Sequence, residues 1–144
     1  NVVTNPAITV ITPISFDHTE YLGEKIEQIA FEKAGIIKQN VPVVIGPQFD
    51  AAFQVLEAKA NSTNSEITAY EYDYIIEKNE NGFLYKCQDS EYQFPKPSLF
   101  GDHQYINASS AIAACLKLKA LGYDKISESS IARGITKAKW AGRI

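Results

Sequence analysis

Residues 14–38, ISFDHTEYLGEKIEQIAFEKAGIIK, join a short apolar run, an Asp-His pair and a helical pattern. The pattern predicts a helix from about residue 24 to residue 34, because its apolar residues recur at helical spacing and form one stripe. This stripe consists of Leu22, Ile26, Ile29, Ala30, Ala34 and Ile37. Lys33 falls in the middle of the stripe, whereas the acidic residues of the helix lie outside it. A helix that turns its apolar face inward is therefore expected to carry the Lys33 amine inward too.

An inward-facing amine makes Lys33 a candidate for a functional site. Burying an unpaired ammonium is costly, so the amine has to become neutral, find an anion or be chemically changed. The alternative is that the side chain reaches along the helix and places its amine in solvent at the helix end. His18, in the preceding loop, is a possible neighbour, and a hydrogen-bonded loop histidine is the alternative for that residue.

The first half of the chain alternates between apolar runs typical of strands and helical patterns. Strands are expected at residues 7–12, 41–45 and 67–72, and a second helix at residues 51–60. This alternation predicts a mostly parallel sheet covered by helices on both faces. In such open sheets, ligands bind beyond the carboxyl ends of the strands, and Asp17-His18 lies a few residues past the end of the first strand.

The second half of the chain begins with a segment, residues 72–94, that is expected to form an antiparallel attachment to the parallel sheet. Asn81-Gly82 lies between two β-prone runs and is a good signal for a hairpin, and residues 92–94 are expected to add a third strand. The fold class is therefore α/β, with a mostly parallel sheet flanked by helices and a small antiparallel attachment.

Two helices are expected after this attachment. Residues 106–121 are apolar on most sides, which predicts a helix packed on more than one side and ended by Gly122. A final helix is expected to begin at Ser127 and to turn Ile131, Ile135 and Ala138 inward.

The composition of the 144 residues is that of an ordinary globular domain, with 45% hydrophobic and 22% charged residues. The formal net charge of −3 argues against a general affinity for nucleic acid or acidic lipid. No apolar run approaches the roughly 20 residues that span a bilayer, and no signal-peptide pattern is visible. The two cysteines show no metal-ligand spacing, and reduced thiols in the cytoplasm are expected. The chain opens on Asn1 and stops shortly after Trp140, so we expect a piece of a longer protein.

Three blocks of residues follow one another in a recognisable order. The first comprises DHTEYLG at 17–23, EKAGIIK at 32–38, VPV at 41–43 and GPQ at 46–48; the second comprises GDHQ at 101–104 with Asn107-Ala108; the third is WAGR at 140–143. With these blocks the chain resembles the central ATP-binding domain of bacterial folylpolyglutamate synthases and dihydrofolate synthases, within the wider Mur ligase group. The blocks run along nearly the whole chain.

The resemblance implies an ATP-driven amide ligase of folate metabolism. In that family a carboxylate takes the γ-phosphoryl group of ATP to form an acyl phosphate, and the amino group of L-glutamate then displaces phosphate. The implied acceptors are dihydropteroate or a reduced folate, and the implied cofactor beside ATP is Mg²⁺. The whole protein is expected to be a cytoplasmic monomer that binds neither nucleic acid nor membranes.

The resemblance also assigns roles to residues of the first and third blocks. His18 is similar to the imidazole ligand of a magnesium ion in the family. Lys33 is similar to a lysine that is carbamylated there: carbon dioxide adds to a neutral amine and gives an anion with two oxygens, which suits Mg²⁺. Arg143 is similar to an arginine that contacts the ATP phosphates. The resemblance therefore makes Lys33 and Arg143 the candidate catalytic residues.

The second block carries the nucleotide-binding candidates. Asn107 is similar to the residue that recognises adenine, and His103 and Gln104 are expected to shape the same pocket. From the residues alone, an asparagine near the start of a helix is usually a cap, and His103 could simply cap or pack there.

The chain also departs from the family pattern. The glycine-rich phosphate loop and a magnesium-binding glutamate of the family precede the region matched by Asn1, and no G-x-x-x-x-G-K-[ST] sequence occurs here. The C-terminal domain is also expected to lie outside residues 1–144, and Ala141 replaces the usual proline. We therefore expect these residues to be part of one ATP-binding domain and to be inactive alone. A Mur-type cell-wall precursor ligase and a non-catalytic nucleotide-binding module remain as alternatives.

Overall fold

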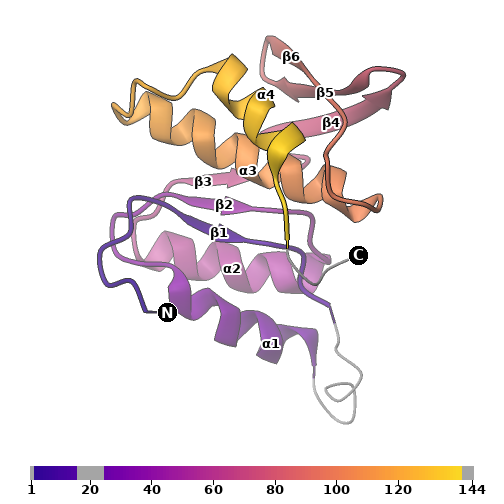
Figure 1. The fold of residues 1–144 in the computed structure, drawn as a ribbon. Coiled ribbons are helices and arrows are strands. Elements are labelled where there is room, and N and C mark those ends of the chain that lie inside the picture. The colour runs from indigo at the N-terminus through magenta and orange to yellow at the C-terminus, as the bar shows by residue number, and fades with distance from the viewer. Residues whose placement is uncertain (1, 16–24, 141–144) are drawn as a thin grey trace. The chain divides into compact units, whose positions relative to one another are not determined.

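The computed structural model describes residues 2–15 and 25–140, and the chain divides into two compact units, Asn1–Ala69 and Tyr70–Ile144 (Figure 1). Each unit contains its own three-stranded sheet. Within the described residues, no helix combines the length and the apolar character needed to cross a membrane.

The first unit is built on a parallel sheet. Its strands are β1 (Thr9–Ile11), β2 (Val43–Ile45) and β3 (Ile67–Ala69), in the order β1-β2-β3. This confirms the parallel sheet predicted from the sequence, with strands shorter than the apolar runs that contain them. Proline limits the ladder, because Pro42 and Pro13 have no backbone N–H to donate; Pro42 still accepts from the Thr9 N–H at 3.0 Å.

Helices α1 (Ile26–Lys33) and α2 (Asp50–Ser62) cover one face of this sheet, and a short 3-10 helix, η1 (Ala34–Ile36), extends α1 (Figure 1). The helices and the sheet share one apolar core, in which Leu56 of α2 and Val43 and Ile45 of β2 are completely buried. The helix predicted at residues 24–34 is therefore confirmed over its described part, and its last turn tightens at Ala34.

The second unit begins with an antiparallel sheet. Its strands are β4 (Tyr74–Asn79), β5 (Gly82–Cys87) and β6 (Ser90–Phe94). Asn79 pairs with Gly82, so the hairpin turn consists of Glu80 and Asn81, and Asn81 N–H donates to the Asn79 side chain at 3.1 Å. The predicted hairpin and its third strand are confirmed.

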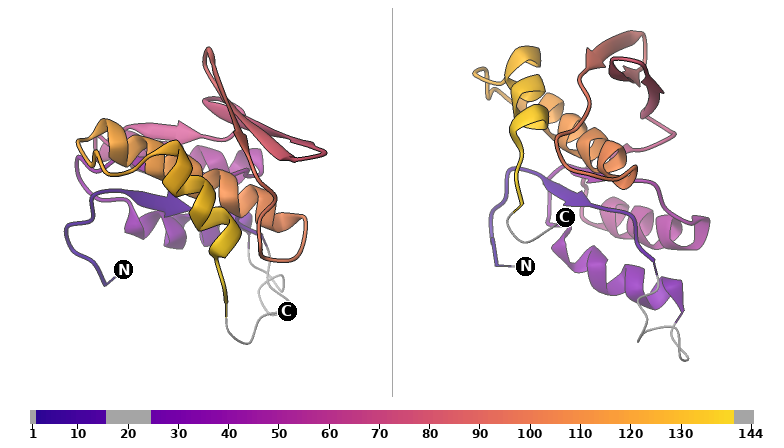
Figure 2. Two further views of the ribbon diagram at one scale, coloured as in Figure 1. Left: turned by 45° about the horizontal axis from the view of Figure 1, so that its top comes forward. Right: turned by 45° about the vertical axis from the view of Figure 1, so that its right-hand side comes forward.

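Two helices complete the second unit and lie side by side in all three views (Figures 1 and 2). Helix α3 (His103–Ala120) contacts both β4 and helix α4 (Glu128–Lys137), which confirms that it is packed on more than one side. Ser127 caps α4, since its hydroxyl accepts from the Ser130 N–H at 3.1 Å. Ile131 is buried, but the inward placement of Ala138 was wrong: α4 ends at Lys137, so Ala138 is an exposed C-cap.

A cluster of aromatic rings forms between β4 and β5. Tyr74 and Tyr85 are each 2% exposed, and their rings stack with centroids 5.3 Å apart. Burial raises the pKa of Tyr74 to about 12, although the nearby Ser110 and Ser109 hydroxyls act to lower it. No described polar atom forms a hydrogen bond with the Tyr74 hydroxyl, which agrees with burial as the main cause of its raised pKa.

We expect the stability of the chain to fall at high pH because of Tyr74. Its pKa is raised in the folded state, so its contribution is complete below pH 10 and is lost as the pH rises from 10 to 12. Tyr74→Phe should flatten the decline of the unfolding free energy over this window by up to about 1.4 kcal/mol per pH unit. Urea unfolding followed by circular dichroism at several pH values measures this slope; a slope identical to that of the unchanged chain would contradict the assignment.

Candidate functional site

The side chain of Lys33 is exposed, so the inward, buried amine expected from the helical stripe was wrong. Lys33 lines a hollow of about 550 Å³ together with Glu32 and Ile36, opposite residues 10–15 of β1 and the segment that follows it. No ion pair or hydrogen bond joins the Lys33 amine to another described residue.

The position of β1 in the sheet explains this difference. Among the described strands, β1 lies at the edge of its sheet and pairs on one side with β2. The stripe of α1 is buried where it faces the core, as Ile29 and Ala30 show with 4% and 0% exposure. The hollow between α1 and this sheet edge has no further described strand above it, so a side chain that points there reaches solvent. The stripe therefore predicted the burial of Ile29 and Ala30 but not the placement of Lys33.

The predicted magnesium site is only partly covered by the described residues. His18 and Arg143 lie outside them, as do Asp17 and Glu20. Within the described part of the chain, no three acidic, histidine or cysteine side chains gather into a group that could hold a metal ion. These residues alone therefore do not fit Mg²⁺, which takes about six oxygen-rich ligands.

The candidate nucleotide-binding residues lie together at the start of α3. The segment before it turns at Gly101, which has a φ of +111°. A Cβ at this position would lie 2.6 Å from the imidazole of His103, so only glycine lets this ring fold back against the turn. The Gln104 N–H donates to the Gly101 carbonyl at 3.0 Å and closes the turn.

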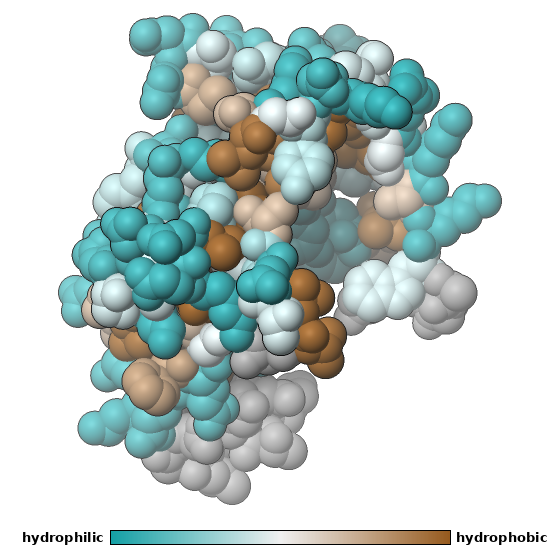
Figure 3. All heavy atoms as spheres, turned by 90° about the vertical axis from the view of Figure 1, so that its left-hand side faces the viewer, coloured by the Kyte–Doolittle hydropathy of each residue, from teal (hydrophilic) through white to brown (hydrophobic). Residues whose placement is uncertain are grey.

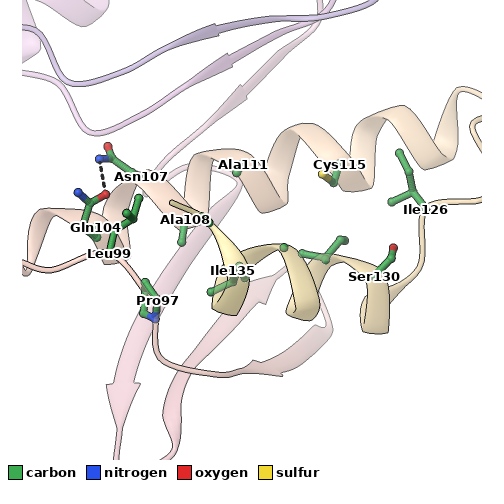
Figure 4. A pocket seen from close by; sticks show the side chains of 13 residues that line it. Pro97, Leu99, Gln104, Asn107, Ala108, Ala111, Cys115, Ile126, Ser130 and Ile135 are labelled. Atoms are coloured by element: carbon green, nitrogen blue, oxygen red, sulfur yellow. Dashed lines mark hydrogen bonds between the residues drawn. The ribbon is translucent and has the colours of Figure 1, made fainter. Parts of the chain in front are cut away.

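A chain of side-chain hydrogen bonds links the three predicted residues. Gln104 is 7% exposed, whereas His103 and Asn107 are exposed. The Asn107 Nδ2 donates to Gln104 Oε1 at 3.1 Å, and Gln104 Nε2 lies 3.2 Å from His103 Nε2 (Figure 4). Neither His103 nor Asn107 acts as a helix cap: the N-cap is Asp102, and its side chain makes no cap hydrogen bond.

Asp102 instead joins α3 to the antiparallel sheet. Its carboxylate accepts from Lys78 Nζ of β4 at 2.9 Å, and this hydrogen bond holds the pKa of Asp102 below its usual value. The Lys78 amine also lies 4.4 Å from the centre of the Tyr105 ring. Although it belongs to the same sequence block, Asp102 therefore anchors the start of α3 rather than facing the amide chain.

An apolar cavity of about 350 Å³ opens beside the amide chain, between α3, α4 and the segment before α3 (Figure 4). Gln104 and Asn107 line it, together with small residues one and two turns further along α3, Ala108 and Ala111. The other walls are Pro97, Leu99, Cys115, Ile126, Ser130, Ile131, Gly134, Ile135 and Ala138. The sequence blocks identified Gln104 and Asn107 but not the cavity that they line, although residues 104, 107, 108, 111 and 115 share one face of a helix.

On the face shown in Figure 3, hydrophilic side chains predominate and apolar ones lie between them. The large apolar side chains exposed on helices and loops include Phe31, Phe49 and Phe100, at 75%, 64% and 87%. Trp140 is 57% exposed.

The chain belongs to the Mur ligase middle domain family, whose sequence profile matches residues 1–115. It is 35% identical to the dihydrofolate synthase/folylpolyglutamate synthase of Bacillus subtilis, over 99% of this chain and 34% of that protein. It is also 31% identical to the folylpolyglutamate synthase of Lacticaseibacillus casei, over 100% of this chain and 35% of that protein. The chain thus spans about a third of the length of these relatives.

Solved structures show the same similarity. A mutant of the L. casei folylpolyglutamate synthase has a TM-score of 0.84 and 31% identity, over 97% of this chain and 35% of that chain. A folylpolyglutamate synthase in complex with AMPPCP and folate has a TM-score of 0.79 and 32% identity, with the same coverage. These similarities confirm the resemblance drawn from the three blocks and the mixed α/β fold class.

Proposed function

We propose that this chain forms part of the ATP-binding middle domain of an amide ligase. The whole protein would add L-glutamate to dihydropteroate, to a folylpolyglutamate or to both, through an acyl phosphate. The observation that carries this proposal is the similarity of nearly the whole chain to folylpolyglutamate and dihydrofolate synthases, both in sequence and in structure. The proposal places the enzyme in the cytoplasm, as a monomer.

The start of α3 is proposed to bind the adenine of ATP. A purine ring needs a flat apolar slot and a few polar groups that fix its orientation, and the cavity beside Asn107 supplies both. Asn107 is exposed at this cavity. Its Nδ2 donates one hydrogen bond to Gln104, and its Oδ1 and second N–H are left to bind a base. The base would lie against Leu99 and Ala108, with Asn107 meeting its polar edge.

Lys33, His18 and Arg143 are proposed to act on the phosphate side of the reaction. The exposed amine of Lys33 is accessible to carbon dioxide, and the resulting carbamate would supply two of the oxygens that a magnesium site requires. His18 is proposed as a further ligand and Arg143 as a contact to the phosphates. The described residues do not form a metal site alone, and the remaining ligands are proposed to come from other parts of the protein.

We propose further that residues 1–144 are part of a single ATP-binding domain and do not catalyse ligation alone. The outer edge of β1 and the hollow beside Lys33 support this proposal, because an edge strand beside a hollow can accept more strands. The phosphate loop and the domain that holds the glutamate would come from other parts of the protein.

Asn107→Ala tests the nucleotide site directly. In the full-length protein we expect the KM for ATP to rise about 10-fold with little change in kcat, since the lost hydrogen bonds hold ATP equally in the ground state and the transition state. Steady-state phosphate release at varied ATP concentrations gives both constants. An unchanged KM would remove Asn107 from the nucleotide site.

A further inference from the structure

Gln104 is a buried amide held between two exposed side chains. One end of the amide accepts from Asn107 and the other faces the imidazole of His103, at 3.1 Å and 3.2 Å. Gln104 itself is buried, with 7% exposure. Its two hydrogen bonds therefore fix the orientation of both neighbours.

The hydrogens of this chain can be assigned from the donors and acceptors. Gln104 Oε1 accepts from Asn107, so the end that faces His103 is the NH₂ group, which can only donate. His103 Nε2 must then accept, and the proton of the neutral ring lies on Nδ1. A free imidazole prefers the opposite tautomer, with its proton on Nε2, so the arrangement leaves a spectroscopic signature.

The same assignment determines what Asn107 presents to a ligand. One N–H of Nδ2 is used by Gln104, which leaves the second N–H and the Oδ1 oxygen as an adjacent donor and acceptor. Adenine carries an amino donor next to a ring-nitrogen acceptor and matches this pair. A purine with a carbonyl at the same ring position carries an acceptor next to a protonated ring nitrogen, so its acceptor and donor stand in the opposite order and each meets a like group of Asn107.

We propose that Gln104 is a positioning residue that selects 6-amino purines over 6-oxo purines by fixing the amide of Asn107. This inference rests on the proposed nucleotide site at the start of α3. Without the Gln104 acceptor, the Asn107 amide can turn over and present its donor and acceptor in either order, so the preference for the amino purine is lost while the cavity remains.

The first test is the tautomer of His103 in the 144-residue chain. The sequence contains two histidines, so a His18→Ala variant leaves His103 as the single imidazole. Long-range ¹H–¹⁵N spectra at pH 8 should show a protonated Nδ1 and an unprotonated Nε2. Gln104→Leu should return the ring to the ordinary tautomer. A protonated Nε2 with Gln104 in place would overturn the inference.

The second test compares ATP with inosine triphosphate as substrates of the full-length protein. Gln104→Leu should lower the ratio of their kcat/KM values about 10-fold. Gln104→Glu keeps the acceptor for Asn107 and loses the donor to His103, so it should keep the ratio and change the tautomer. Ser109→Ala, which removes a buried hydroxyl that bonds to Ile106 in the same helix, serves as the control for stability and should keep both.

These variants separate the inference from the function on which it rests. If Asn107→Ala raises the KM for ATP while Gln104→Leu leaves the nucleotide ratio unchanged, the site stands and the positioning role of Gln104 is wrong. If Asn107→Ala changes neither constant, the proposed nucleotide site fails, even where the His103 tautomer is as expected. If Gln104→Leu does not fold, Gln104→Glu still tests the inference. A lower ratio of kcat/KM for ATP to kcat/KM for inosine triphosphate in this variant would contradict it.

Discussion

Lys33→Met in the full-length protein is expected to lower the rate of ATP-dependent ligation by at least about 100-fold, the loss typical of removing one group that stabilises charge in a reaction centre. The substitution should leave the fold intact, because the Lys33 side chain is exposed and joins no ion pair among the described residues. A lysine with only a structural role at this position would therefore cost little in either stability or rate. Initial rates of phosphate release and the midpoint of thermal unfolding measure the two effects separately.

Two further variants show which property of Lys33 matters. Lys33→Arg keeps a positive charge but cannot form a carbamate, so a carbamate role predicts that this variant is as inactive as Lys33→Met. Lys59→Met removes an exposed lysine from α2 of the same unit and should keep full activity. Activity retained in Lys33→Arg would contradict carbamylation, and activity retained in Lys33→Met would exclude Lys33 from the site.

Gly82→Ala is expected to destabilise the second unit by at least about 3 kcal/mol, because two costs coincide at this residue. Gly82 has a φ of +140°, a conformation that L-residues rarely adopt. An added Cβ would also overlap the backbone of the adjacent strand, lying 2.1 Å from the Phe94 carbonyl oxygen and 2.7 Å from the Pro95 carbonyl carbon. Because these contacts are with backbone, no side-chain movement relieves them.

The control for Gly82 is a glycine in an ordinary helical position. Gly134 lies within α4, and an added Cβ there meets no atom within 4 Å. Gly134→Ala should therefore stabilise the chain by up to about 1 kcal/mol, since alanine has the higher helix propensity. Urea unfolding of the two variants gives changes of opposite sign if the geometry at Gly82 is correct. Similar small changes in both would contradict it.

Local patterns were sufficient to predict most elements of the fold. β-branched runs located the three parallel strands, and the Asn-Gly pair located the hairpin, because these signals depend on neighbouring residues only. The lengths were less predictable: Pro13 and Pro42 shortened the ladder, and the turn at Gly101 allowed α3 to begin at His103 instead of residue 106. These boundaries depend on the pairing of distant segments.

The candidate site was predictable as a set of residues but not as an arrangement. The sequence block identified Gln104 and Asn107, yet their hydrogen bond depends on rotamers that no spacing rule specifies. For Lys33, helical periodicity predicted a direction, whereas its exposure depends on β1 being the edge of the described sheet. The burial of a residue depends on the segments that pack against it, and the sequence of its own segment does not show which segments these are.

The most direct test of the proposed ligase is the reaction itself. The full-length protein should be incubated with ATP, Mg²⁺ and L-glutamate, separately with dihydropteroate, tetrahydrofolate and a cell-wall precursor with a free carboxylate, and its products should be followed by mass spectrometry. We predict a product heavier by one glutamate residue, with one phosphate released per bond, from dihydropteroate or tetrahydrofolate. Ligation to the cell-wall precursor alone, or binding of ATP without any ligation, would contradict the proposed function.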